Sequence, residues 1–153
     1  MDVSAKLAEL GLVLPVASLP VAAYIPAVKT GNLVFTAGQL PLVDGKIPYV
    51  GKVDGGVTPE QAKEMAQVCI LNALAAINTV ANVDDIVRVV RVVGYVNGVS
   101  GFINCPFVVN GASELLIKLW GDVNGKHARS AIGVAELPLD APVEIELTVE
   151  LKS

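Results

Sequence analysis

Apolar and polar residues alternate strictly through Val143-Glu144-Ile145-Glu146-Leu147-Thr148-Val149-Glu150-Leu151, which is the clearest structural signal in the sequence. Apolar residues at every second position are typical of a β-strand with one buried face and one exposed face. The segment Ile86–Val96 is rich in β-branched residues and predicts a second long strand. Arg129–Val134 predicts a third. The protein is therefore expected to contain a sheet.

Two shorter strands are expected nearer the N-terminus, over Tyr24–Val28 and Leu33–Thr36. Between them, Gly31-Asn32 offers the positive-φ positions of a tight hairpin turn. Lys46–Val50 is a candidate for a short edge strand, since Pro48 cannot donate a backbone hydrogen bond to a neighbour.

Two helices interrupt this series of strands. The first starts at Thr58-Pro59-Glu60-Gln61, where Thr58 and Gln61 can form a capping box, and should run to about Ala81. The second opens at Asn104-Cys105-Pro106 and closes at Gly121. The residues expected on the buried faces are Ala62, Met65, Ala66, Cys69, Ala73, Ile77 and Val80 in the first helix and Val109, Ala112, Leu116 and Leu119 in the second.

The order β-β-(β)-α-β-α-β-β predicts an α+β fold in which two helices pack on one face of a mixed sheet. Residues 1–153 are expected to form a single domain, with residues 1–20 as an N-terminal extension. That extension reads as a helix over Val3–Leu10, closed by Gly11, and a coil over Leu14–Pro20. Two helices leave the other sheet face without a cover, and the natural cover is the sheet of another subunit.

The composition also favours a subunit interface. Hydrophobic residues make up 53% of the chain, against about 45–50% in a typical protein. No membrane span is expected, because every apolar stretch of about 18 residues is broken by charges, amides or helix breakers. Obligate interfaces resemble a domain core cut in half, so the surplus indicates a homo-oligomer.

The net charge and the cysteine content limit which partners and which cellular compartment are expected. The net charge is −4, and without a basic run such a chain is a poor match for nucleic acid. Met1–Gly11 lacks the pattern of a secretory signal. Cys69 and Cys105 lie far apart in expected helical surroundings, which suits a reducing cytoplasm better than a disulfide framework. A cytoplasmic location is therefore expected.

The residues of several common kinds of site are missing. His127 is the single histidine, and the two cysteines form no CxxC pair, so no metal site is expected. The sequence contains no GxSxG, GxGxxG or GxxxxGK[ST] pattern. We therefore expect neither a serine-hydrolase elbow nor a nucleotide cofactor.

The remaining polar chemistry concentrates in residues 125–138, Gly-Lys-His-Ala-Arg-Ser-Ala-Ile-Gly-Val-Ala-Glu-Leu-Pro, followed by Pro142-Val143-Glu144-Ile145-Glu146. This arrangement resembles the closing motif of the RidA family, also called YjgF or L-PSP. Earlier landmarks agree in order: Tyr24, the segment Val34–Pro41 with its Gly-Gln-Leu-Pro turn, and Val109–Ser113. The similarity covers about Tyr24 to Val149, and the form of Asn110–Ser113 is that of a distinct branch.

The resemblance implies a fold similar to Bacillus-type chorismate mutase, assembled as a homotrimer with a central barrel and a cleft between each pair of subunits. It also implies hydrolysis of reactive enamines and imines, derived from amino acids, to a 2-keto acid and ammonia without a cofactor. Arg129 would hold the substrate carboxylate and Glu144 would position water or shuttle a proton. Tyr24 would close the pocket and Asn110 would add a polar contact.

Two of the family's cleft positions differ here: Ala37 stands where a small hydroxyl is frequent, and Ala131 where a cysteine is common. A non-enzymatic trimer that binds small carboxylates, or acts like a chaperone, therefore stays open as an alternative. Arg129 could also form an ordinary ion pair, and Glu144 could face solvent or pair with Arg88. The ribonuclease activity implied by the L-PSP name is disfavoured by the acidity and the single histidine.

Overall fold

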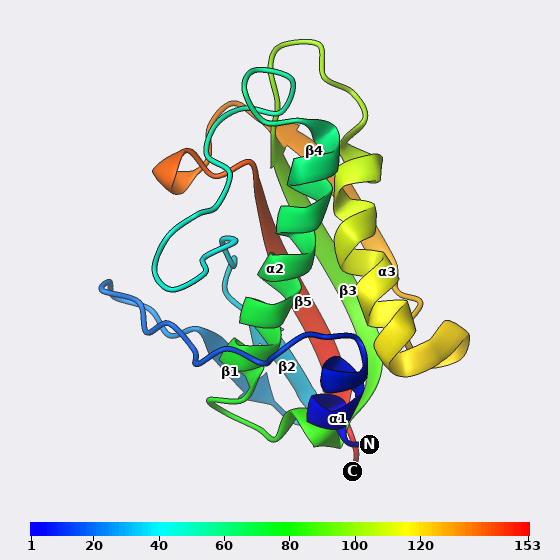
Figure 1. Ribbon diagram of the computed structural model, residues 1–153. Helices are drawn as coiled ribbons and strands as arrows, with labels where there is room; N and C mark the ends of the chain where they lie inside the picture. Colours follow the sequence, from blue (N-terminus) through cyan, green and yellow to red (C-terminus); the bar gives the residue numbers. More distant parts are fainter.

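A computed structural model, which describes residues 1–153, shows a five-stranded sheet whose strands follow the order β1-β2-β5-β3-β4 (Figure 1). Helices lie over one face of this sheet. The strands are β1 (Ala27–Thr30), β2 (Leu33–Thr36), β3 (Ile86–Asn97), β4 (Ala128–Val134) and β5 (Val143–Leu151), and the helices are α1 (Val3–Glu9), α2 (Pro59–Ile77) and α3 (Cys105–Asn124). Short 3-10 turns occupy Val83–Asp85 and Pro138–Asp140. The predicted mixed α+β fold is confirmed.

The alternating segment forms the central strand. β5 pairs antiparallel with β2 on one side and with β3 on the other. Its apolar residues are buried and its glutamates are only partly exposed, as the sequence pattern predicts. β4 runs parallel to β3 because α3 carries the chain back across the sheet between them.

Helix α2 starts as predicted. Thr58 Oγ1 accepts from the backbone N–H of Gln61 at 3.1 Å, and Gln61 Oε1 accepts from the N–H of Thr58 at 2.9 Å. The predicted end at Ala81 is wrong, because the helix stops at Ile77 with Asn78 as its cap. Val80 therefore lies outside the helix and is 37% exposed rather than buried.

Helix α3 continues past its predicted end. Gly121 has a φ of +76°, which interrupts the helical backbone, and one further turn reaches Asn124. The interior apolar residues predicted for this helix are all fully buried: Val109, Ala112, Leu116 and Leu119. Gly121 therefore interrupts the helical backbone, as predicted, but it does not end α3.

Two glycines bring α3 unusually close to its neighbours. A Cβ atom added at Gly94 of β3 would lie 2.3 Å from Val109 Cγ2 of α3. One added at Gly111 of α3 would lie 1.9 Å from the carbonyl oxygen of Lys63 in α2. Both helices therefore pack tightly against each other and against the sheet only because these positions have no side chain.

The N-terminal strands differ from the prediction. β1 begins at Ala27, and Tyr24 lies in a bend with 57% of its surface exposed. Pro26 immediately precedes the strand and has no N–H to donate. Gly31 does take the predicted positive φ, at +58°. Lys46–Val50 forms no strand: Lys46 makes only an isolated bridge to Val43 around a turn.

The face of the sheet opposite α2 and α3 carries exposed apolar side chains. Val28, Phe35 and Ile132 are 43–49% exposed there. These residues lie on the same face as Glu144, Glu146 and Tyr95, because strand partners share a face and alternate with the buried positions. No helix of the structure has both the length and the apolar character that crossing a membrane requires.

We predict that Gly111→Ala lowers the free energy of unfolding by about 2 kcal/mol. Alanine gains about 1 kcal/mol in helix propensity, but its methyl group would overlap the Lys63 backbone carbonyl, and such overpacking costs about 3 kcal/mol, the upper end of the usual range. Urea denaturation measures the difference, with Lys118→Ala, an exposed change on the same helix, as the control. An unchanged or raised unfolding free energy for Gly111→Ala would contradict the packing account.

Candidate functional site

Arg129 is held by helix α3. Its Nη1 donates to Asn110 Oδ1 at 2.8 Å and to Ser113 Oγ at 3.2 Å. Asn110 and Ser113 are three residues apart, so they project from the same side of the helix over the edge strand β4. The arginine of the closing motif is therefore hydrogen-bonded to two residues of helix α3.

The remaining donors of Arg129 are free. An arginine has five N–H donors, and the two hydrogens of Nη1 have acceptors in Asn110 and Ser113. Nε and Nη2 make no hydrogen bond within the chain, and Arg129 forms no ion pair with any of its carboxylates. The half-buried guanidinium thus presents one edge that matches the two oxygens of a carboxylate.

Ser113 is bonded in turn to the single histidine. The distance from Ser113 Oγ to His127 Nε2 is 3.0 Å, and that from His127 Nδ1 to the carbonyl oxygen of Gly125 is 2.6 Å. Burial lowers the pKa of His127, and the charge of Arg129 lowers it further. His127 is therefore linked to Arg129 through the hydroxyl of Ser113.

Glu144 lies on the opposite, open face of the sheet. It alternates with Val143 and Ile145, both fully buried under the helices, and its strand partner is Tyr95. The expected alternative pairing with Arg88 is wrong, because Arg88 lies opposite Glu150. Burial raises the pKa of Glu144, and the neighbouring charge of Glu146 raises it further.

The Gly-Gln-Leu-Pro turn lies against Glu144. A Cβ atom at Gly38 would come within 2.6 Å of Glu144 Oε1, so the carboxylate rests directly on the glycine backbone. Gln39 exchanges two backbone hydrogen bonds with Ile145, which fixes the turn beside the strand. Tyr24, Gly38 and Gln39 share the lining of a hollow of about 280 Å³. Ala37 immediately precedes this turn.

Within one subunit, the residues around Arg129 and those around Glu144 lie on opposite faces of the sheet. Arg129 pairs with Val92, which pairs with Leu147, and the last two are buried beneath the helices. Arg129, Asn110 and Ala131 therefore belong to the helix side, whereas Glu144 belongs to the open face. Tyr24 lines a hollow with Gly38, whose backbone Glu144 touches, and Ala37 precedes Gly38 in the chain. A single chain thus cannot bring Arg129 and Glu144 to one small ligand.

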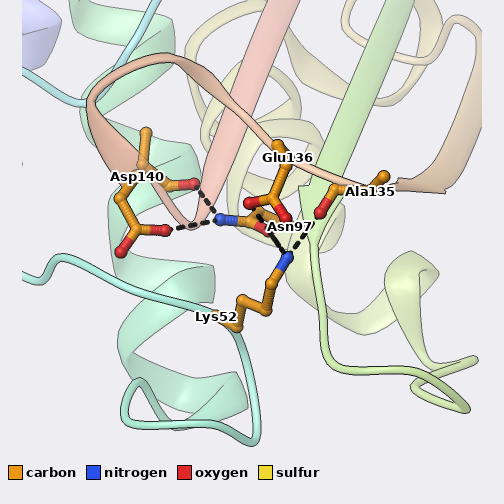
Figure 2. Close-up of polar contacts among 6 residues, drawn as sticks. Lys52, Asn97, Ala135, Glu136 and Asp140 are labelled. Atoms are coloured by element: carbon orange, nitrogen blue, oxygen red, sulfur yellow. Dashed lines mark hydrogen bonds and ion pairs between the residues drawn. The ribbon is translucent and has the colours of Figure 1, made fainter.

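A second polar cluster, which sequence reasoning missed, organises the turn before β5 (Figure 2). Lys52 Nζ donates to Asn97 Oδ1 at 2.7 Å and to the Ala135 carbonyl oxygen, and it lies 3.3 Å from Glu136 Oε2. The buried Asn97 amide donates to Asp140 Oδ1 at 3.2 Å. All three hydrogens of the Lys52 ammonium group have acceptors, so this cluster holds the loops together and leaves no ammonium hydrogen for a ligand.

The signals for these missed residues were weak in the sequence. Ser113 and His127 lie in the two segments that resemble the family, Val109–Ser113 and residues 125–138, but their spacing in the sequence does not indicate that they form a hydrogen bond. Lys52 lies in a glycine-rich loop and Asn97 at a strand end, 45 positions apart. Only the fold brings such residues together.

Comparison with known proteins places this geometry in a family. The model of the family described as Endoribonuclease L-PSP matches residues 15–151. Protein TCP17 of Trypanosoma cruzi is 34% identical over 99% of this chain and 95% of its own length. The crystal structure of Atu1372 from Agrobacterium tumefaciens, a protein of unknown function, has a TM-score of 0.90 and 39% identity, covering 98% of this chain and 92% of its own.

A more distant structure shows the same fold. The YjgF gene product of E. coli has a TM-score of 0.62 at 24% identity and covers 89% of this chain and 94% of its own. The match of the family model to nearly the whole chain agrees with the closing motif around Arg129 and Glu144. The chain therefore belongs to the Endoribonuclease L-PSP family, which includes the YjgF and RidA proteins.

Proposed function

We propose that this protein is a homotrimer that hydrolyses small enamines and imines of amino-acid origin, with Arg129 holding the substrate carboxylate. The observation that carries the proposal is the free Nε and Nη2 edge of an arginine whose Nη1 is fully used by Asn110 and Ser113. Two parallel charge-assisted hydrogen bonds from such an edge bind a carboxylate with defined orientation. The absence of any carboxylate partner within the chain leaves that edge available.

We place the cleft between subunits because Arg129 and Glu144 lie on opposite faces of one sheet. In a ring of identical subunits, the helix-side edge of one subunit can meet the open face of the next. The apolar residues on that face, including Phe35 at 43% exposure and Ile132 at 48%, would be buried by this contact. Each cleft would then combine Arg129 and Ala131 of one subunit with Glu144, Tyr24 and Ala37 of its neighbour.

The chemistry within such a cleft is an addition of water followed by loss of ammonia. An enamine first accepts a proton from solvent on its terminal carbon and becomes an iminium ion, the protonated form of an imine. The oxygen of water then attacks the imine carbon while Glu144 accepts a proton from it. Proton delivery to nitrogen and loss of the hydroxyl proton to solvent then allow the carbon–nitrogen bond to break, which gives a 2-keto acid and ammonia. Burial beside Glu146 raises the pKa of Glu144, which suits a carboxyl that must both accept and donate a proton.

A carboxylate-binding or chaperone-like trimer without catalysis is the second candidate. It is favoured by Ala37 and Ala131, which place methyl groups where the family often has a hydroxyl and a thiol. Replacing the hydroxyl and the thiol by methyl groups would not affect carboxylate binding by Arg129, but it would remove polar groups near the reacting atoms. The two functions therefore differ in turnover, and both require carboxylate binding.

We predict that the wild-type protein accelerates release of pyruvate from freshly generated 2-aminoacrylate, and that Arg129 and Glu144 variants lose this in different ways. Arg129→Ala should raise KM, lowering kcat/KM about 100-fold, because two charge-assisted hydrogen bonds are lost. Glu144→Gln should lower kcat about 100-fold with little change in KM. Stopped-flow measurement of pyruvate release, with pyruvate binding by calorimetry in parallel, separates the two effects.

Two outcomes would reject parts of the proposal. Wild-type protein that binds pyruvate through Arg129 without accelerating its release from 2-aminoacrylate supports the non-catalytic binder instead. Equal pyruvate binding by wild type and Arg129→Ala removes both candidate functions.

We also predict that Glu146→Gln moves the acidic limb of the kcat/KM profile to lower pH. Removing the Glu146 charge takes away one cause of the raised pKa of Glu144, so Glu144 stays deprotonated at lower pH. Glu150→Gln is the matched control, because Glu150 lies six positions beyond Glu144 along β5 and accepts from Asn32. A limb that stays in place, or that moves to higher pH, argues against Glu144 as the group that titrates.

A further inference from the structure

A directed chain of hydrogen bonds ends on Arg129. The Gly125 carbonyl oxygen can only accept, so His127 Nδ1 carries the hydrogen in their 2.6 Å contact. In a neutral imidazole, Nε2 is then an acceptor, and the Ser113 hydroxyl at 3.0 Å donates to it. The lone pairs of Ser113 Oγ are left to accept from Arg129 Nη1 at 3.2 Å. Every hydrogen in the chain therefore has a defined direction.

The local environment maintains this direction. His127 is partly buried, and burial together with the charge of Arg129 lowers the pKa of its imidazole, which favours the neutral form. A neutral acceptor at Nε2 keeps the serine hydrogen pointing away from the guanidinium. Without that acceptor, the hydroxyl hydrogen could turn toward Arg129, where it would oppose the N–H of Nη1.

This series of hydrogen bonds matters because a single acceptor does not fix the orientation of a guanidinium group. Asn110 Oδ1 alone, at 2.8 Å, would leave the plane of Arg129 free to turn about that single hydrogen bond. Ser113 supplies the second acceptor for the same nitrogen, one helical turn away. Two acceptors on Nη1 define the plane of the group and hence the direction of the Nε and Nη2 edge.

We propose that Ser113 and His127 are positioning residues, which together orient the carboxylate-binding edge of Arg129 without touching the ligand themselves. This inference rests on the proposed carboxylate binding at Arg129 and deepens it. It assigns a role to the only histidine of the chain and to a helix serine, neither of which the sequence analysis placed in the site. A purely structural link between α3 and β4 would affect stability alone, so the test needs a readout on the arginine itself.

The first readout is the nitrogen-15 NMR spectrum of the arginine side chains. The chain has three arginines, Arg88, Arg91 and Arg129, and the Arg129→Lys variant identifies the signals of the third. In the wild type, the Nη1 and Nη2 signals of Arg129 should be resolved, because hydrogen bonding of Nη1 slows rotation about the Nε–Cζ bond. In Ser113→Ala and His127→Leu they should merge. His127→Gln, which can supply an acceptor oxygen at the Nε2 position, should keep them resolved.

The second readout is the dissociation constant for pyruvate, measured by calorimetry on the full chain. Ser113→Ala and His127→Leu should weaken pyruvate binding about tenfold, and His127→Gln should stay within about threefold of wild type. Ser4→Ala is the matched control, since Ser4 is an exposed helix serine whose hydroxyl makes no hydrogen bond in the chain. Thermal unfolding of each variant checks that the fold is retained.

The two readouts separate failure of this inference from failure of the proposed function. Resolved Nη signals in both Ser113→Ala and His127→Leu would overturn the positioning role, whether or not pyruvate binds. Merged signals with unchanged pyruvate affinity would also overturn it, because orientation would then not matter for binding. If the wild type binds no pyruvate at all, the proposed function fails, while the spectrum still reports whether Ser113 and His127 orient the guanidinium.

Discussion

Helix α3 approaches both of its neighbours closely, and this packing determines the surroundings of Arg129. Gly94 lets Val109 reach the sheet, and Gly111 lets the helix touch the backbone of α2 at Lys63. This packing places Asn110 and Ser113 beside β4, where both accept from Arg129. A helix displaced by the width of one methyl group would withdraw both acceptors from the guanidinium.

The division of the sheet into two faces determines what one chain can do by itself. The helices cover the side to which Arg129 belongs, while Glu144 lies on the side that carries exposed Val28, Phe35 and Ile132. Under the proposed function, Arg129 and Glu144 are two half-sites that a neighbouring subunit would bring together. The high apolar content of the chain agrees with this arrangement, because apolar side chains on an otherwise open sheet face become the core of an interface.

Much of the fold could be predicted because its signals are local. The alternation in β5 and the capping box of α2 each follow from residues a few positions apart. The errors came from competing local signals. The sequence predicts a strand from Tyr24, whereas the strand starts only after Pro26, and it predicts a helix end at Gly121, whereas the helix resumes beyond that residue.

The site was less accessible to sequence reasoning. The motif pointed to Arg129 and Glu144, but not to the sheet faces that separate them, since these depend on register across three strands. The bonds of Ser113 to His127 and of Lys52 to Asn97 join residues 14 and 45 positions apart. Polar contacts of this kind depend on loop placement and leave no periodic pattern in the sequence.

Mixing of two inactive variants tests the shared cleft most directly. Arg129→Ala and Glu144→Gln subunits are combined in equal amounts and allowed to exchange, and native mass spectrometry verifies that mixed trimers form. The account predicts recovery of about one quarter of wild-type 2-aminoacrylate hydrolysis, because random assembly gives that share of clefts an intact arginine from one subunit and an intact glutamate from its neighbour. Mixed trimers no more active than the separate variants would contradict it.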